Sequence, residues 1–164
     1  MSIRDDRRTV EWDDYGNVCA VIVECGGQVF SWKRFKIAVY YLSRKGSAEG
    51  RESEPLLSYG FDEYCYAGPD DVELKTDIEA LTAAGYLEVR MEEVPGASEH
   101  LVFKATESGR ELGLLAQGHW TESQMKVVTS LAEDLRDPMR SVSLLLQKYA
   151  RKWDAACQTK TPRQ

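Results

Sequence analysis

The sequence predicts a mainly helical α+β domain, and two kinds of apolar spacing carry that prediction. Apolar residues three and four positions apart recur through both ends of the chain, which is typical of amphipathic helices. Between them, residues 86–91 alternate apolar and charged side chains, as a half-buried strand does, and residues 101–105 are a plausible return strand. The nine residues that join these segments include Pro95-Gly96, so the segments should pair as a hairpin.

Two helices are expected in the first part of the chain. Residues 12–25 carry apolar side chains at helical spacing, and Gly26-Gly27 follows where a helix would stop. A strand over residues 18–23 is the alternative, because β-branched side chains crowd there. Ser31 is the candidate N-cap of a second helix that runs through Arg44.

One further helix is expected before the hairpin. Residues 56–61 are interpreted as a short strand. Asp70 and Glu73 have the spacing of a capping box at the start of a helix over residues 71–84. Gly85 is the residue at which this helix should end.

A helix is also expected after the hairpin, with Thr106 as its N-cap and its end near Gln117. A helix, a hairpin and another helix in this order are typical of a winged helix-turn-helix core, in which the hairpin is the wing. The predicted fold is therefore α+β and mainly helical, with a winged helix-turn-helix core, a β-hairpin wing and two additional C-terminal helices.

The two C-terminal helices are marked by their first residues. Thr121 and Gln124 form a capping-box pair that opens one helix, and Asp137-Pro138 places an N-cap before a proline at the first position of the last helix. Apolar residues recur every three or four positions through both: Met125, Val128, Ala132, Leu135, Met139, Val142, Leu146, Tyr149 and Trp153. This seam either packs on the first helix within the domain or forms an interface with a second copy or a partner helix. The candidate residues of such a dimer seam are Met139, Val142, Leu146, Tyr149 and Trp153.

Length and composition predict one domain without a membrane span. A chain of 164 residues with 43% hydrophobic residues is long enough for one core. We expect a single domain over residues 1–157 and a flexible tail over residues 158–164. No stretch approaches the roughly 18 uninterrupted apolar residues of a membrane span, and the first residues lack the apolar segment of a signal peptide. A cytoplasmic protein with reduced cysteines is therefore expected.

Charge is distributed unevenly along the chain. Residues 51–100 contain thirteen Asp or Glu against three Arg or Lys, although the net charge of the whole chain is only −6. The helix before a wing normally enters the major groove of DNA, where cations neutralise phosphates. Here that helix and the wing are acidic, so the sequence favours a protein partner with a basic surface. The candidate protein-interaction residues are Asp70, Asp71, Glu73, Asp77, Glu79, Glu92 and Glu93.

Binding to DNA is the alternative. Lys33, Arg34 and Lys36 lie together at the start of the second helix, and further basic residues occur near both termini. In this interpretation the protein is a transcriptional regulator that contacts DNA through those three residues and through basic residues of the termini. The pI of about 5.1 disfavours nucleic acid, because domains that bind it are normally basic.

No enzyme, metal or cofactor is predicted. The sequence contains no P-loop, dinucleotide-binding, zinc-protease or nucleophile-elbow motif. His100 and His119 lie in different loops, and a zinc site needs three or four converging donors. The acids around Asp70, Glu73 and Asp77 fit a solvated helix start better than a site for Mg²⁺ or Ca²⁺. We therefore expect a non-enzymatic binding protein.

Several short motifs resemble one group of small proteins. The motifs are Phe61-x-x-Tyr64, Gly68-Pro69, Leu74-x-x-Asp77-Ile78-x-x-Leu81 and Gly85-Tyr86-Leu87, with Gly26-Gly27, Phe35 and Tyr40 upstream and residues 103–110 downstream. Over residues 18–113 they resemble the YwgA-like and SocA-like (Panacea) group of bacterial and archaeal proteins. The chain departs from that pattern at Lys36-Ile37, Ala67 and Asp70-Asp71. The resemblance implies a winged-helix core without enzymatic residues and, in the antitoxin branch, binding to a partner protein; an antitoxin-like or adaptor-like role is expected.

Overall fold

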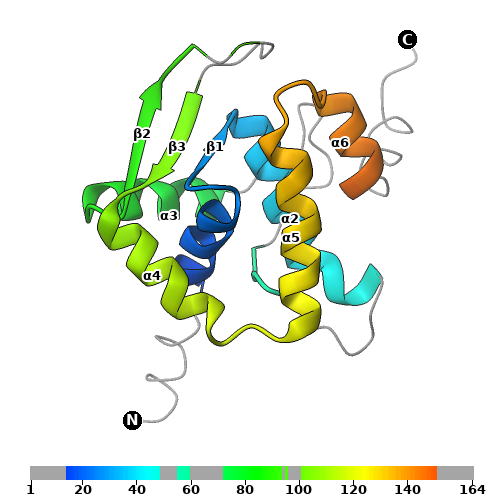
Figure 1. The fold of residues 1–164 in the computed structure, drawn as a ribbon, viewed down its shortest axis with the longest axis horizontal. Helices are drawn as coiled ribbons and strands as arrows, with labels where there is room; N and C mark the ends of the chain where they lie inside the picture. The colour runs from blue at the N-terminus through cyan, green and yellow to red at the C-terminus, as the bar shows by residue number, and fades with distance from the viewer. Residues whose placement is uncertain (1–13, 49–54, 60–71, 94, 96–100, 151–164) are drawn as a thin grey trace.

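The structure is a computed structural model that describes residues 14–48, 55–59, 72–93, 95 and 101–150. Within these residues it is a mainly helical α+β fold with a small antiparallel sheet (Figure 1). A first helix covers residues 14–24. The other elements are β1 (Gln28–Phe30), α2 (Trp32–Ala48), α3 (Val72–Ala83), β2 (Leu87–Met91), β3 (Leu101–Ala105), α4 (Glu107–Gln117), α5 (Glu122–Arg136) and α6 (Val142–Tyr149).

The first helix is confirmed, and the alternative strand over residues 18–23 is wrong. Val18, Val21 and Ile22 are fully or almost fully buried, so the β-branched side chains there fill the core from a helix. Gly26 and Gly27 have φ angles of 93° and 97°, which glycine adopts without a Cβ penalty. This reversal leads directly into β1, a strand that the sequence analysis did not predict.

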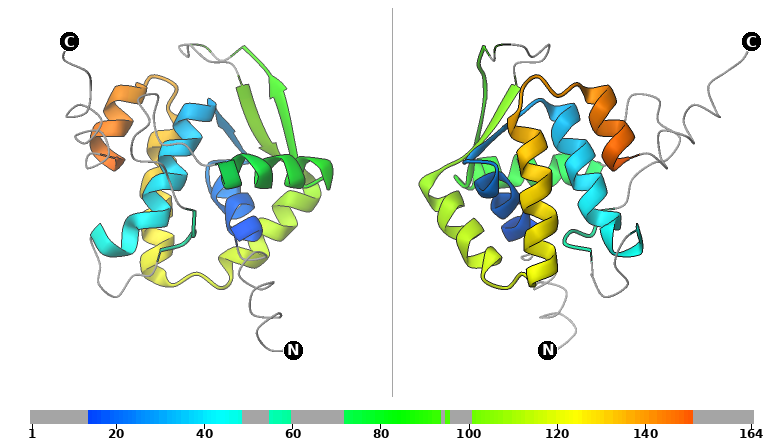
Figure 2. Two further views of the ribbon diagram at one scale, coloured as in Figure 1. Left: turned by 180° about the vertical axis from the view of Figure 1, so that it is seen from behind. Right: turned by 45° about the vertical axis from the view of Figure 1, so that its right-hand side comes forward.

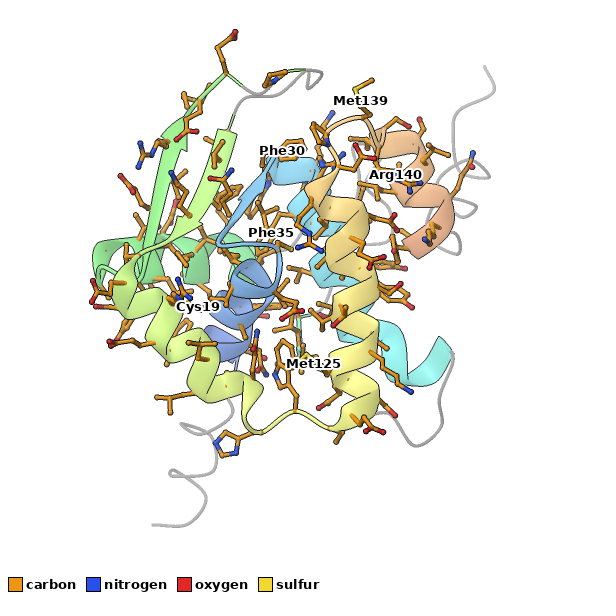
Figure 3. The ribbon with its side chains drawn as sticks, in the orientation of Figure 1. Cys19, Phe30, Phe35, Met125, Met139 and Arg140 are labelled. Atoms are coloured by element: carbon orange, nitrogen blue, oxygen red, sulfur yellow. The ribbon has the colours of Figure 1, made fainter. Side chains whose placement is uncertain are left out.

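Helix α2 runs through the middle of the molecule and contacts α5, α6 and strand β1 of the sheet (Figures 1 and 2). Ser31 is its N-cap as predicted, because the Ser31 hydroxyl accepts a hydrogen bond from the Arg34 N–H at 3.2 Å. Phe35 stacks on Phe103 of β3, with ring centroids 5.6 Å apart, and Trp32 is tilted against the same ring. This aromatic cluster joins α2 to the sheet, and Figure 3 shows Phe35 near the centre of the molecule.

The hairpin of β2 and β3 is confirmed. Its strands pair antiparallel, with Val89 opposite Phe103, and β1 pairs with the other side of β3 to give the order β1-β3-β2. Helix α3 precedes the hairpin and packs on β2, and Gly85 turns the chain with a φ of 88°. Residues 55–59 form no strand, which corrects the prediction for 56–59; residues 60 and 61 lie outside the described residues.

Helices α4 and α5 begin where the sequence predicts. The Thr106 hydroxyl accepts a hydrogen bond from the Gly109 N–H at 3.1 Å, and Thr121 with Gln124 forms a complete capping box. The predicted start of the last helix at Asp137-Pro138 is wrong, because α6 begins at Val142 with Ser141 as its N-cap. The carboxylate of Asp137 instead accepts a hydrogen bond from the Met139 N–H at 2.9 Å, and the chain turns before α6 begins.

None of the helices in the described part of the chain is long and apolar enough to cross a membrane.

The start of α4 approaches the backbone of the turn before β2 very closely. A Cβ at Gly109 would lie 2.0 Å from the carbonyl oxygen of Tyr86, a distance that no side-chain rotation relieves. Further along α4, a Cβ at Gly113 would lie 3.0 Å from the Cα of Ala20 in the first helix. The two glycines therefore let α4 pack directly on backbone.

Replacing Gly109 with alanine should lower the free energy of unfolding by about 3 kcal/mol or more, because α4 must move away from Tyr86. The measurement is urea unfolding followed by tryptophan fluorescence. Gly118→Ala is the control, since Gly118 has a right-handed backbone and its added Cβ would have its nearest contact at 3.2 Å. Equal losses for the two variants would contradict the close approach at Gly109.

Candidate binding surface

The outer side of α3 is acidic. Leu74, Ile78 and Leu81 are buried, and helical spacing therefore turns Glu73 and Glu79 outward, where both are exposed. Lys75 is an exposed cation of the same helix. The predicted residues Asp70 and Asp71 lie outside the described residues.

Asp77 is held by a neighbour from another segment. It is half-buried, and its carboxylate accepts a hydrogen bond from the hydroxyl of Tyr59 at 2.6 Å. This contact fixes the segment around Tyr59 against α3. Asp77 therefore serves packing at least as much as it contributes charge to the surface.

The acids of the wing are partly neutralised by ion pairs. Arg90 contacts Glu88 at 2.9 Å and Glu92 at 3.2 Å, and Lys104 contacts Glu92 at 3.7 Å. Glu93 is exposed beyond the end of β2. Glu92 thus shares its charge with two cations, whereas Glu73 and Glu79 of α3 are exposed.

The three basic residues at the start of α2 do not form a basic surface. Lys33 is exposed, but Arg34 and Lys36 are buried, with 3% and 7% of their surface exposed. The ammonium of Lys36 lies 5.8 Å from the ring of Trp32. The interpretation of this segment as a surface for nucleic acid is therefore wrong for Arg34 and Lys36.

Arg34 binds the C-terminal end of α5. Its guanidinium donates hydrogen bonds to the carbonyls of Asp134, Leu135 and Asp137, at 3.1, 3.0 and 2.9 Å, and to the carbonyl of Arg140. These carbonyls lie at or beyond the end of the helix, which has negative partial charge. Burial lowers the pKa of Arg34, and the charges of Asp137 and Asp134 oppose that shift.

The other face of this guanidinium lies over an aromatic ring. The guanidinium carbon of Arg34 is 4.4 Å from the centre of the Phe30 ring, which belongs to β1. Its Nε is buried and has no hydrogen-bond partner in the described residues. The side chain therefore joins the sheet, α2 and α5 at one place.

Asp134 connects α5 to α6 beside that arginine. Its side chain is buried and accepts hydrogen bonds from the Tyr149 hydroxyl and from the Lys148 ammonium, the latter at 2.8 Å. Arg140 lies 3.5 Å away. Burial raises the pKa of the Asp134 carboxyl, but the hydrogen bonds from Lys148 and Tyr149, together with the charges of Lys148 and Arg140, hold it below its usual value of 3.8.

The apolar seam of the C-terminal helices packs within the domain, where both α5 and α6 contact α2. Helix α5 also contacts the first helix, because the Thr129 hydroxyl donates a hydrogen bond to the Glu24 carboxylate at 3.3 Å. Helix α6 packs on α2, where the ring of Tyr149 meets that of Tyr41 with centroids 4.9 Å apart. Val142 and Leu146 are half-buried in this contact. Met139 is 75% exposed and points away from the helices (Figure 3), while Trp153 lies outside the described residues.

Sequence reasoning missed the cluster around Arg34 and Asp134, although both residues carried a signal. Asp134 lies seven residues after Val127 and three after Leu131, at helical spacing beside apolar residues. Arg34 and Lys36 stand in a segment whose remaining residues to Leu42 are mostly apolar all round the helix, which is typical of a buried helix.

Among the described residues, no group of three or more Cys, His, Asp or Glu is placed to hold a metal ion. His119 is exposed, and His100 lies outside the described residues. Burial raises the pKa of the Cys19 and Cys25 thiols to about 12, so these thiols remain protonated at neutral pH.

Comparison with known proteins adds no relative: no protein-family model, curated protein or solved structure matches the chain.

Replacing Arg34 with methionine should lower the free energy of unfolding by about 3 kcal/mol or more, because four carbonyls lose a buried donor. Urea unfolding at pH 7 measures the loss. Lys33→Met is the control, because Lys33 is exposed on the same helix. If Arg34→Met were as stable as Lys33→Met, water would be replacing the guanidinium as hydrogen-bond donor to these carbonyls.

Asp134→Asn should change the pH dependence of stability. Because the folded pKa of Asp134 lies below 3.8, its charge stabilises the fold above that pH, and this contribution is lost as pH falls through the folded pKa. Wild type should therefore be more stable than the variant at pH 7, and the difference should shrink in acid. Urea unfolding at a series of pH values, with Glu133→Gln on the same helix as control, measures it; a difference independent of pH would contradict the assignment.

Proposed function

We propose that this chain is a non-enzymatic winged-helix binding protein, antitoxin-like or adaptor-like, that binds a basic surface of a partner protein through the outer side of α3. The observation that carries the proposal is the charge of α3, which presents Glu73 and Glu79 to solvent directly before the hairpin. A helix in this position is the recognition element of a winged helix.

The order of the elements supports a winged-helix core. A helix, a short strand, two helices and a hairpin follow one another, and the first strand pairs with the second strand of the hairpin. The connection between α2 and α3, residues 49–71, is much longer than the three or four residues of a usual helix-turn-helix. The sheet, more than the turn, is therefore the feature that supports this fold.

The burial of Arg34 and Lys36 weakens the alternative, a DNA-binding regulator. Arg34 already donates to four carbonyls and has no free surface for phosphate. Lys148, one of the basic residues near the C-terminus, contacts Asp134 at 2.8 Å. Acids on α3 would repel phosphates where a winged helix normally meets DNA.

The charge of α3 can be reversed without touching the core. Glu73→Lys together with Glu79→Lys changes two exposed residues, and Glu107→Lys together with Glu111→Lys makes the same change on the exposed side of α4. Each tagged protein is used to capture partners from the cells that produce it, with quantitative mass spectrometry. The captured amount of basic proteins should be about tenfold or more lower with the α3 variant than with wild type. With the α4 variant it should be unchanged.

DNA binding is tested in parallel with labelled duplex DNA by fluorescence anisotropy at about 50 and 200 mM salt. We expect no binding at either concentration. Binding at low salt that collapses at high salt, together with partner capture that survives reversal of α3, would replace the proposal with the regulator.

A further inference from the structure

The outer edge of the sheet is formed by β2, at the left of Figure 1. The Thr106 N–H donates a hydrogen bond to the Tyr86 carbonyl at 3.1 Å, so these two residues form a hydrogen-bonded pair. Along an antiparallel ladder, hydrogen-bonded pairs of residues alternate with pairs that are not hydrogen-bonded. The backbone groups of the even-numbered residues of β2 therefore point to β3. Those of the odd-numbered residues point to the open edge: Leu87, Val89 and Met91.

The hydrogen bonds on the other side of β3 agree with this assignment. The Ser31 N–H donates to the Leu101 carbonyl at 2.6 Å, and the Ala105 N–H donates to the Gly27 carbonyl at 3.0 Å. The backbone N–H and C=O groups of the odd-numbered residues of β3 thus point to β1. Those of its even-numbered residues point to β2. No other strand in the described residues pairs with the open edge of β2.

The side chains of β2 are self-complementary in charge. Exposed edge strands usually carry charges that prevent pairing with another strand. Here Glu88 and Arg90 have opposite signs, lie on the same face of the strand, and have side chains 53% and 44% exposed. On the other face, at the end of the strand, Met91 is 71% exposed.

We propose that a second copy of this chain pairs with β2 in an antiparallel arrangement whose twofold axis passes through Val89. In that register Glu88 of each copy lies opposite Arg90 of the other, and Leu87 lies opposite Met91. The hydrogen-bonded pairs between the two copies then consist of the odd-numbered residues, whose backbone N–H and C=O groups point to the open edge. The two sheets join into one of six strands.

The parity of the strand makes this register specific. A shift of one residue would bring Glu88 opposite Val89 and place inward-pointing backbone groups at the bonded pairs. A shift of two residues moves the twofold axis to Glu88 or Arg90, where like charges would meet directly. Only the register centred on Val89 satisfies both the outward backbone groups and the opposite charges within β2.

The test exchanges the charges of β2 between two variants. In Glu88→Arg the strand carries two arginines, and in Arg90→Glu it carries two glutamates. Analytical ultracentrifugation of wild type should show a dimer that forms with concentration. Each variant alone should associate about tenfold or more weakly, because like charges face one another, whereas an equimolar mixture should recover association.

A matched control and a residue-level measurement accompany this test. Glu111→Arg makes the same charge change at an exposed position of α4, outside β2, and should associate as wild type does. Hydrogen exchange should show that the amides of Val89 and Met91 become protected as protein concentration rises. The amide of Arg90, which points to β3, should be protected at every concentration.

Three results would overturn the proposal. One is a wild-type chain that stays monomeric at concentrations up to about 1 mM; the edge would then be left for an extended segment of another protein. The second is a dimer that both variants form as well as wild type. The third is a mixture of folded variants that does not associate better than each alone. None of these results bears on the partner proposed for α3.

Discussion

The guanidinium of Arg34 is the constraint on which the arrangement of the helices depends. It begins on α2, lies over Phe30 of β1 and ends among carbonyls of α5 and of the turn before α6. A buried cation is costly unless its N–H groups are paired, so the end of α5 must stay where those carbonyls face it. Asp134 on the same turn of α5 then holds Tyr149 and Lys148 of α6. Both C-terminal helices are thus oriented on α2 by polar contacts that surround one side chain.

The elements that the sequence predicted correctly are those with local chemical signals at their ends. Ser31, Thr106 and Thr121 are N-caps in the structure, and each hydroxyl accepts a backbone hydrogen bond three residues later. Gly85 and the pair Gly26-Gly27 turn the chain with positive φ angles. Such signals act within a few residues, and therefore a single sequence suffices to read them.

The features that escaped prediction depend on contacts distant in sequence. β1 has only three residues, too few to show alternation, and exists because β3 pairs with it 72 to 76 residues later. Asp137-Pro138 looks like a helix start but lies in the turn whose carbonyls face Arg34. For the candidate surface, the outward position of Glu73 and Glu79 followed from helical spacing. The burial of Arg34 and Lys36 did not, because a cation in an apolar helix reveals its partner only in three dimensions.

The separation between Arg34 and the carbonyls it binds has a consequence for biosynthesis. The two ends of this contact are 100 to 106 residues apart, so most of the chain must leave the ribosome before they can meet. Until then, a cation lies in the first turn of an apolar helix with no carbonyls to receive it. The core around α2 therefore closes late, and the nascent chain has a long interval in which chaperones can bind its exposed apolar segments.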